Sequence, residues 1–342
     1  MSPSQPISVR AGAPAVLELP PAHLELAWRP LRVQDASALH ALMSTVEAHD
    51  GTHTRHSYAE VLELLSGPRM DPTHDGLAGF DEDGTMRAYG LVEVDDTDPR
   101  VLRAVLLGGV HPDWRGRGIG RAILAWKEGR ARQRLAESGT TLPARLAVMV
   151  EERARDHRRL YAAAGFSPIR WCSAMRRDLR EPLPQRGAPE GVVITPWSPD
   201  VDEQVRLAHN EAFAEHWGCA PQSTQSWALR SSGFAADWSW VAFDEARPGE
   251  VIGYLLSAHY EQDWPAVGYS CGFTDAVGVS TGWRGRGVGS ALLVAAMTSY
   301  RDAGLDYACL RVDTANPTGA GTLYAELGYE QTHGYVMYSV EI

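Results

Sequence analysis

The sequence carries the same glycine-rich segment twice, and this repeat constrains the fold more than any other feature. VHPDWRGRGIG at 110–120 reappears as VSTGWRGRGVG at 279–289. Downstream, LYAAAGF at 160–166 reappears as LYAELGY at 323–329. Two unrelated motifs that recur in the same order at nearly the same offset predict two copies of one domain within the chain.

The segment between the two copies has the composition of a linker. Residues 180–191, REPLPQRGAPEG, are rich in Pro and Gly and show no period. We therefore expect a first domain at 23–179 and a second domain at 192–342, with an N-terminal extension at 1–22. The length of 342 residues suits two domains of ordinary size.

Hydrophobic periodicity predicts the same succession of elements in each half. In the first half we expect strands at 24–33, 76–80, 86–94, 101–110 and 144–150 and from 166 to 178, and helices at 36–49, 57–65, about 119–137 and 155–165. In the second half we expect strands at 192–197, 238–243, 250–260, 273–280, 307–313 and 337–340, and helices at 201–216, 225–232, 287–303 and 318–328. This succession predicts a mixed α/β fold, of the α+β mixed-sheet kind, with mostly antiparallel strands.

Each glycine-rich segment lies between a predicted strand and a predicted helix, which suits the binding of an anion. Glycines let the backbone adopt positive φ and approach a ligand closely. The first N–H groups of the helix and its positive dipole end favour negative charge. Arg115 and Arg284 can add charge-assisted bonds to phosphate oxygens. The turn is therefore predicted to hold a pyrophosphate.

Two other phosphate-binding turns fit the sequence less well. The Walker motif GxxxxGK[ST] is absent. A dinucleotide-binding turn follows the first strand of a parallel sheet, whereas these turns follow the fourth strand of each half. A nucleotide-dependent enzyme that uses these turns stays open as an alternative. It predicts that ATP or NAD, but not CoA, raises the thermal stability of the protein.

The combination of motifs resembles the GCN5-related N-acetyltransferase (GNAT) superfamily. The (Q/R)-x-x-G-x-(G/A) turn of that family binds the pyrophosphate of acyl-CoA, and it matches 115–120 and 284–289. The tandem arrangement is similar to mycothiol synthase and related bacterial double-GNAT proteins. The resemblance implies two tandem acyl-CoA N-acyltransferase domains that use acetyl-CoA, or another acyl-CoA, as co-substrate and that need no metal.

The resemblance also implies a set of CoA-binding residues on the strand, the turn and the first helical turn. In the second half these are Val277, Gly278, Val279, Arg284, Gly285, Arg286, Gly287, Val288, Gly289, Ser290 and Asn316. In the first half they are Gly108, Gly109, Val110, Arg115, Gly116, Arg117, Gly118, Ile119 and Gly120. The first half has no counterpart of Asn316, so its site departs from the family pattern.

The same resemblance implies the catalytic groups. A tyrosine on the helix after the next strand often protonates the departing CoA thiolate, and Tyr324 and Tyr161 match it. The attacking amine must lose a proton, and Asp275, on the strand that enters the second turn, is the candidate base. Because the second half holds both Asn316 and Tyr324, we expect it to be the catalytic domain.

The acceptor amine is expected to meet the helix of the second half that walls the acceptor site in this family. Glu215, His216 and Trp217 are the candidate substrate-binding residues there, and Glu215 and His216 are also alternative bases. Glu211 and His209 are on the same helix, where facing solvent is the alternative for both.

Charge narrows the class of partner. The net charge is −11, and residues 181–342 carry 8 Lys and Arg against 20 Asp and Glu. This acidic half disfavours nucleic acid and favours a small cationic molecule. No apolar stretch is long enough to span a membrane, and the start lacks a secretory signal, so a cytoplasmic protein is expected. We expect a monomer or a homodimer. Four distant cysteines without a CxxC pair predict free thiols.

These observations predict an acyl-CoA-dependent N-acyltransferase. Acetyl is the expected acyl group, and it passes by direct attack to a primary amine of a small cationic molecule. The alternatives are a non-catalytic tandem module that binds or senses CoA, and a mycothiol-synthase-like acetylation of a thiol-sugar amine.

Overall fold

The described chain divides into two compact units. The first, unit 1, contains Met1–Ile169 together with Val336–Ile342, and the second, unit 2, contains Arg170–Tyr335. None of the helices in the described ranges has the length and apolar character needed to span a bilayer. The computed structural model describes residues 5–95, 98–214, 216–219, 221–228, 233–315 and 319–342.

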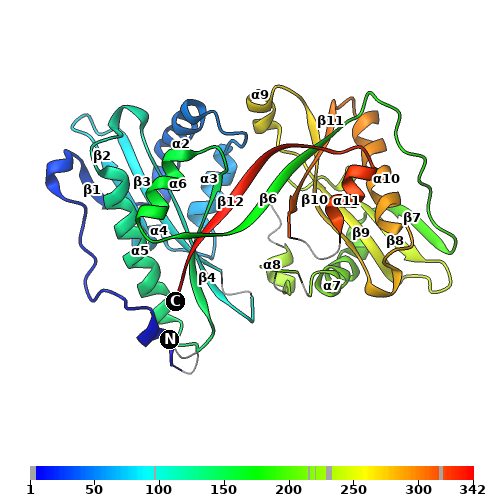
Figure 1. Ribbon diagram of the computed structural model, residues 1–342, viewed down its shortest axis with the longest axis horizontal. Helices are drawn as coiled ribbons and strands as arrows, with labels where there is room; N and C mark the ends of the chain where they lie inside the picture. Colours follow the sequence, from blue (N-terminus) through cyan, green and yellow to red (C-terminus); the bar gives the residue numbers. More distant parts are fainter. Residues whose placement is uncertain (1–4, 96–97, 215, 220, 229–232, 316–318) are drawn as a thin grey trace. The chain divides into compact units, whose positions relative to one another are not determined.

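Unit 1 is a mixed sheet with helices on both faces (Figure 1). Its strands follow the order β1 (Ala27–Pro30), β2 (Gly76–Phe80), β3 (Met86–Asp95), β4 (Leu102–Val110) and β5 (Ala144–Glu151). The β4–β5 pair is parallel, and the others among these strands are antiparallel. Its helices are α1 (Ile7–Arg10), α2 (Ala36–Asp50), α3 (Tyr58–Ser66), α4 (Pro72–Asp75), α5 (Ile119–Glu137) and α6 (Arg155–Ala163).

Unit 2 repeats this arrangement, so the mixed α/β class predicted from the sequence is confirmed. Its strands follow the order β6 (Ser167–Asp178), β11 (Tyr307–Asp313), β10 (Cys271–Val279), β9 (Val251–Ala258), β8 (Trp240–Asp244) and β7 (Val192–Pro196). Only the β10–β11 pair is parallel among these strands. Its helices are α7 (Asp202–Ala212), α8 (Thr224–Ala228), α9 (Trp264–Val267), α10 (Val288–Asp302) and α11 (Ala320–Glu326).

The last strand, β12 (Glu330–Glu341), begins in unit 2 and ends in unit 1. Val336 and Tyr338 belong to the same apolar core as the residues of β4 and β5. The Ile342 N–H donates to the Ala144 carbonyl at 2.8 Å. The sequence predicts a boundary at 180–191, whereas the compact units divide inside β6 and β12, because the repeat locates equivalent elements without showing which sheet a strand completes.

Two predicted segments differ from the structure. The N-terminal extension is partly folded into unit 1, since Ile7 of α1 is fully buried in its core. Helix α7 ends at Ala212, four residues before the predicted end at 216. The aromatic residues Phe213 and His216 extend the helical periodicity of the sequence beyond Ala212. Their rings still pack together after the helix has ended, with centroids 5.3 Å apart.

The core of unit 2 fixes β10 against α10. The Tyr300 ring of α10 covers Gly272, where an added Cβ would overlap the ring. The Tyr300 hydroxyl lies 2.7 Å from Ser257 Oγ of β9 and 3.3 Å from Thr274 Oγ1 of β10. Two strands and a helix therefore meet at one buried phenol, directly before the segment that leads into the turn.

Candidate active site

Both glycine-rich turns have the backbone that the sequence predicts. The φ angles of Gly285 and Gly287 are 72° and 88°, and those of Gly116 and Gly118 are 80° and 94°. Each turn leads directly into the N-terminus of a helix, α10 or α5. No side chain in the described ranges caps either helix, so the first N–H groups are left to water or to a bound molecule.

The parallel strands separate before each turn. β10 pairs with β11 only over Cys271–Thr274, and β4 pairs with β5 only over Leu102–Val105. Beyond these residues each strand keeps its antiparallel neighbour on the other side. Within the described ranges, one edge of the last part of β10 and of β4 therefore faces no other strand.

The hydrogen-bond register shows which residues present their backbone at this open edge. The Ser280 N–H donates to the Ile252 carbonyl of β9 at 2.9 Å. Because successive residues alternate their polar groups between the two edges of a strand, Gly278 points to β9 as well. Val277 and Val279 therefore direct their N–H and C=O groups to the open edge, where a thioester would meet them.

The glycines before each turn serve packing. A Cβ on Gly278 would lie 2.6 Å from Cε1 of Tyr254. A Cβ on Gly109 would lie 2.9 Å from Cε1 of Tyr89 in unit 1. Since the backbone of both glycines is directed to the neighbouring strand, these positions admit the tyrosine rings rather than present hydrogen bonds to a ligand.

A β-bulge distinguishes unit 2 from unit 1. The register between β9 and β10 shifts between Thr274 and Ala276, which leaves Asp275 without a partner residue. The equivalent β3–β4 pairing runs from Ala88 to Asp95 without a shift. Bulges of this kind redirect a side chain next to active sites. The residue redirected here is the carboxylate predicted to be the base.

The surroundings of Asp275 raise the pKa of its carboxyl group above the ordinary value. Its side chain keeps contact with solvent, yet the protein atoms around it shield the carboxylate. This desolvation raises the pKa of Asp275, while the charge of Arg311 and a hydrogen bond from Tyr260 act in the opposite direction. A raised pKa makes the carboxylate a better proton acceptor.

A half-buried histidine and a buried tyrosine form a hydrogen-bonded pair in the same unit. His209 Nδ1 of α7 is 2.6 Å from the Tyr254 hydroxyl of β9. The His209 ring stacks on Phe213 at 4.7 Å and packs against Trp227 at 5.1 Å. Burial lowers the pKa of His209 to about 4, so its imidazole is neutral at physiological pH.

The sequence leaves open that His209 and Glu211 face solvent, whereas the His209 ring packs against Phe213 and Trp227 and Glu211 makes hydrogen bonds. His209 lies four residues after the buried Val205, which places both on one helix face. That spacing is the signal in the sequence. The Glu211 carboxylate accepts hydrogen bonds from the Thr281 N–H and the Ser280 hydroxyl, both at 3.0 Å.

The first arginine of each glycine-rich turn holds that turn in place. Arg284 Nε donates to the Val279 carbonyl at 3.2 Å, and its Nη2 donates to the Ala212 carbonyl at 2.9 Å. Arg115 Nε donates to the Val110 carbonyl at 3.1 Å, and its Nη atoms form a bidentate ion pair with the carboxylate of Asp50. These contacts join each turn to the end of α7 or α2.

The tyrosines that match the expected general acid are buried on equivalent helices. Tyr324 of α11 belongs to the core cluster against which Val277 packs. Burial raises the pKa of Tyr324 to about 12 and that of Tyr161 of α6 to about 12. Both phenols therefore carry their proton at physiological pH, which a general acid requires.

Comparisons with known proteins identify the fold and the family. The sequence model of the acetyltransferase (GNAT) domain matches residues 80–168 and 236–331. A mycothiol acetyltransferase of Thermobispora bispora is 33% identical over 89% of this chain and 95% of its own length. A mycothiol acetyltransferase of Salinispora arenicola is 32% identical over 82% of this chain and 92% of its own.

This chain belongs to the GNAT acetyltransferase family. A solved GCN5-related N-acetyltransferase of Sphaerobacter thermophilus has a TM-score of 0.71 at 25% identity and covers 95% of this chain and 97% of its own. A tandem GNAT protein from the clavulanic acid biosynthesis pathway shares the fold, with a TM-score of 0.65 at 20% identity over 93% and 98% of the two chains. The chain is an N-acetyltransferase with two GNAT domains, and its family uses acetyl-CoA.

Two predicted residues of this GNAT protein, Glu215 and Asn316, lie outside the described residues. Among the remaining acceptor candidates, His216 Nδ1 lies 3.3 Å from the Cys219 thiol sulfur. The Trp217 ring lies 4.8 Å from the guanidinium of Arg170. His216 and Trp217 therefore lie in the loop after α7.

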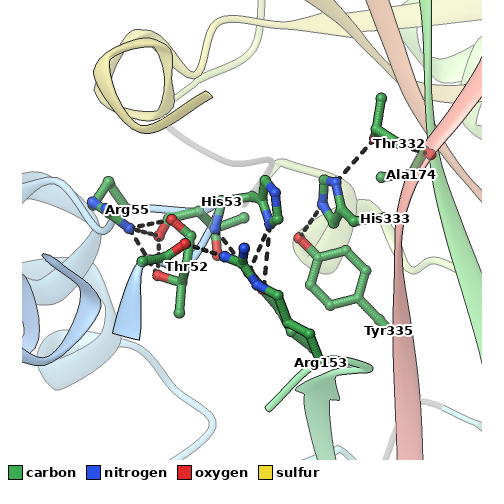
Figure 2. Close-up of polar contacts among 11 residues, drawn as sticks. Thr52, His53, Arg55, Arg153, Ala174, Thr332, His333 and Tyr335 are labelled. Carbon is green, nitrogen blue, oxygen red and sulfur yellow. Dashed lines mark hydrogen bonds and ion pairs between the residues drawn. The ribbon is translucent and has the colours of Figure 1, made fainter. Parts of the chain in front are cut away.

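In unit 1, the first GNAT domain, the loop after α2 is held to the end of β5. The His53 N–H donates to the Glu151 carboxylate at 2.7 Å, and Arg153 Nε donates to the same carboxylate at 2.8 Å. Figure 2 shows His53 and Arg153 side by side, with Arg55 bonded to Thr52. Within the second GNAT domain, the same figure shows His333 Nε2 facing the Tyr335 hydroxyl, at 3.0 Å.

A recess of about 370 Å³ adjoins the turn of the first GNAT domain. Its wall includes Gly118 of the turn, Ala122 of α5 and three cationic or titratable side chains, those of His23, Arg117 and Arg121. An anionic group is favoured by these side chains and by the helix N-terminus. Added Cβ atoms on Gly116 and Gly285 would meet nothing within 4 Å, so both turns leave space for the diphosphate of acyl-CoA.

Proposed function

We propose that unit 2 is the catalytic unit and that it acetylates the primary amine of a small, thiol-bearing sugar conjugate of the mycothiol class. The bulge at Asp275 is the observation that carries the first half of this proposal, because it redirects a carboxylate beside the open edge of β10. The corresponding strand of unit 1 has no bulge and no carboxylate at the equivalent position, Leu106.

The reaction is proposed to proceed by direct attack. Asp275 accepts a proton from the acceptor ammonium or amine. The amine nitrogen then attacks the thioester carbonyl, and the N–H of Val277 or Val279 stabilises the oxyanion. The C–N bond forms first and the nitrogen loses its second proton. The C–S bond then breaks as Tyr324 gives its proton to the CoA thiolate, and the second proton from the nitrogen restores the phenol. The products are an acetamide and CoA.

The residues of unit 2 fit acetyl-CoA in the donor role. The turn at Gly285 and Gly287 and the N-terminus of α10 would hold the diphosphate. The open edge at Val277 and Val279 would hold the pantetheine and the thioester. Acetyl-CoA supplies the activated acetyl group, and this chain's own residues orient it and move the protons.

The proposed acceptor class rests on relatives and on charge. The relatives named mycothiol acetyltransferase match nearly their whole length. The acidic second half favours a protonated amine on its approach, through long-range attraction that salt screens. We therefore expect KM for the acceptor to rise with ionic strength while KM for acetyl-CoA changes less.

The test is a CoA-release assay with acetyl-CoA and a panel of amines. The unacetylated mycothiol precursor is expected to give the highest kcat/KM, above glucosamine, cysteine and spermidine. Product must also be identified by mass as the N-acetyl derivative. A polyamine or free amino acid that exceeds the precursor overturns the acceptor class, and turnover unaffected by Asp275→Asn overturns the assignment of the base.

A further inference from the structure

The side chain of Lys127 is the most unusual group outside the site of unit 2. Lys127 is the only lysine in the chain. It lies on α5, and only 3% of its surface is exposed to solvent. Within the described ranges no hydrogen-bond or ion-pair partner of its amine is found. Burial of an amine without a partner costs free energy, so its position calls for a physical account.

The amine lies at the strand that corresponds to the thioester-binding strand of unit 2. A Cβ on Gly108 would lie 2.9 Å from Lys127 Nζ. Gly108 holds the place of Val277, because each is seven residues before the arginine of its turn, Arg115 or Arg284. Since the His111 N–H donates to the Arg87 carbonyl of β3, alternation directs the backbone of Gly108 to the open edge of β4.

Unit 1 is built to admit this lysine. Gly90 pairs with Gly108 across β3 and β4, and a Cβ on Gly90 would lie 3.1 Å from Lys127 Cγ. The equivalent pair in unit 2 is Leu255 and Val277, and Ala296 stands where unit 1 has Lys127. Unit 2 therefore has two large side chains on the strands and a small one on the helix. Unit 1 has two glycines on the strands and the long lysine side chain on the helix.

The surroundings of the amine favour its neutral form. Burial lowers the pKa of Lys127 to about 7. His157 of α6 is a titratable neighbour of Lys127. Burial lowers the pKa of His157, and the positive charges of Arg115 and Lys127 lower it further, whereas the negative charge of Asp50 raises it. A sizeable fraction of the lysine is therefore an unprotonated nucleophile near neutral pH.

We propose that Lys127 is an acyl acceptor: acetyl-CoA held by the turn of unit 1 transfers its acetyl group to Lys127 Nζ. The inference rests on the proposed function in that it takes the turn of unit 1 to hold acetyl-CoA. The amine nitrogen attacks the thioester carbonyl, the C–N bond forms and the C–S bond breaks. One amine proton passes to the departing thiolate, so the products are an acetamide on Lys127 and free CoA.

The experiment is intact-protein and peptide mass analysis after incubation with acetyl-CoA. Because the chain has one lysine, the only other amine is the N-terminal one, and Lys127→Met identifies any acetylation there. We expect one acetyl group on the Lys127 peptide, formed about tenfold or more faster than with the same concentration of acetyl phosphate. Excess desulfo-CoA is expected to suppress it.

Two variants separate this inference from the proposed function. Gly118→Asp is expected to slow the acetylation of Lys127 about tenfold or more by repelling the diphosphate. Tyr324→Phe is expected to leave the acetylation unchanged while it lowers turnover of the amine acceptor. Turnover without acetylation of Lys127 overturns the inference alone, and acetylation without any acceptor turnover overturns the proposed function alone. Acetylation that desulfo-CoA and Gly118→Asp leave unchanged is ordinary chemical acylation and also overturns the inference.

A second measurement is independent of the acetyl group. With carbon-13 at the lysine ε position, the protein gives one side-chain signal, and its titration reports the pKa of Lys127 directly. A midpoint near 7 supports a neutral nucleophile, whereas the midpoint of an exposed lysine, about 10.4, contradicts it.

Discussion

The Tyr254 hydroxyl and His209 Nδ1 lie 2.6 Å apart, which joins α7 to the middle of β9 inside unit 2. Tyr254 is fully buried, and burial raises its pKa well above the ordinary value. The imidazole is neutral for the same reason. Helix α7, which precedes the loop with His216 and Trp217, is therefore joined to the sheet by a hydrogen bond between two neutral groups.

This pair makes the stability of unit 2 depend on pH. The pKa of His209 is about 4 in the folded protein and 6.5 in the unfolded chain. Between these values the unfolded chain binds more protons, so the free energy of unfolding falls as pH decreases from 6.5 to 4. The full loss is about 3 kcal/mol. Urea unfolding at several pH values is expected to show this loss, and His209→Gln is expected to remove it. An unchanged pH dependence in the variant contradicts the burial of a neutral imidazole.

Asp275→Asn is expected to lower kcat about 100-fold, because the neutral amide cannot accept the proton of the amine. In the unmodified enzyme, kcat/KM is expected to fall as pH decreases through the pKa of Asp275, which lies above its ordinary value. The variant should lose this acidic limb of the profile. Asp302→Asn, at the exposed end of α10, is the control and should retain both the rate and the limb.

Tyr324→Phe is expected to lower kcat about tenfold or more through loss of the general acid. Tyr161→Phe is the matched control, because Tyr161 has the same place in the repeat and burial raises its pKa to the same value. Steady-state kinetics on both variants tests which unit turns over. Equal losses in the two variants would place catalysis in both units, and a loss confined to Tyr161→Phe would reverse the assignment.

Gly287→Asp is expected to abolish turnover. Its carboxylate would stand where the diphosphate is bound, and the φ of 88° strains any side chain with a Cβ. Gly118→Asp carries the same charge at a φ of 94°, so the two variants have similar strain. The second variant is expected to retain turnover within a few-fold. Calorimetry with acetyl-CoA should show that each variant loses binding at its own unit.

Removal of Val336–Ile342 is expected to destabilise unit 1 rather than unit 2. The segment supplies Val336 and Tyr338 to the core of unit 1. The Ile342 carbonyl accepts a hydrogen bond from Arg10 Nη1 at 2.6 Å. Hydrogen exchange of the truncated protein should show faster exchange in β4 and β5. Protection that is lost only in β9 and β10 would contradict the division of the chain at Tyr335.

The sequence predicted most of the fold because each half repeats strong local signals. The glycines of both turns have the positive φ that their spacing requires, and α5 and α10 begin where the turn ends. Local signals do not report which sheet a strand joins, so the crossing of β12 from unit 2 to unit 1 was not predictable from its own residues.

The site was predicted in part. The position of Asp275 on the strand before the turn was predicted, but its bulge depends on the register with β9 and has no local signal. The role of Arg284 towards phosphate stays a prediction, and the contacts of its guanidinium with the Val279 and Ala212 carbonyls could not be predicted from local sequence. Contacts between residues far apart in sequence, such as His209 with Tyr254, arise only when helix and sheet pack together.

The crossing of β12 also sets an order of events during synthesis. The sheet of unit 1 receives a strand from Val336–Ile342, which follows all of unit 2 in the sequence. The edge of β5 therefore stays uncovered until the residues of unit 2 have been synthesised. The first half of the sequence, expressed alone, would therefore leave the sheet of unit 1 without the strand that covers β5.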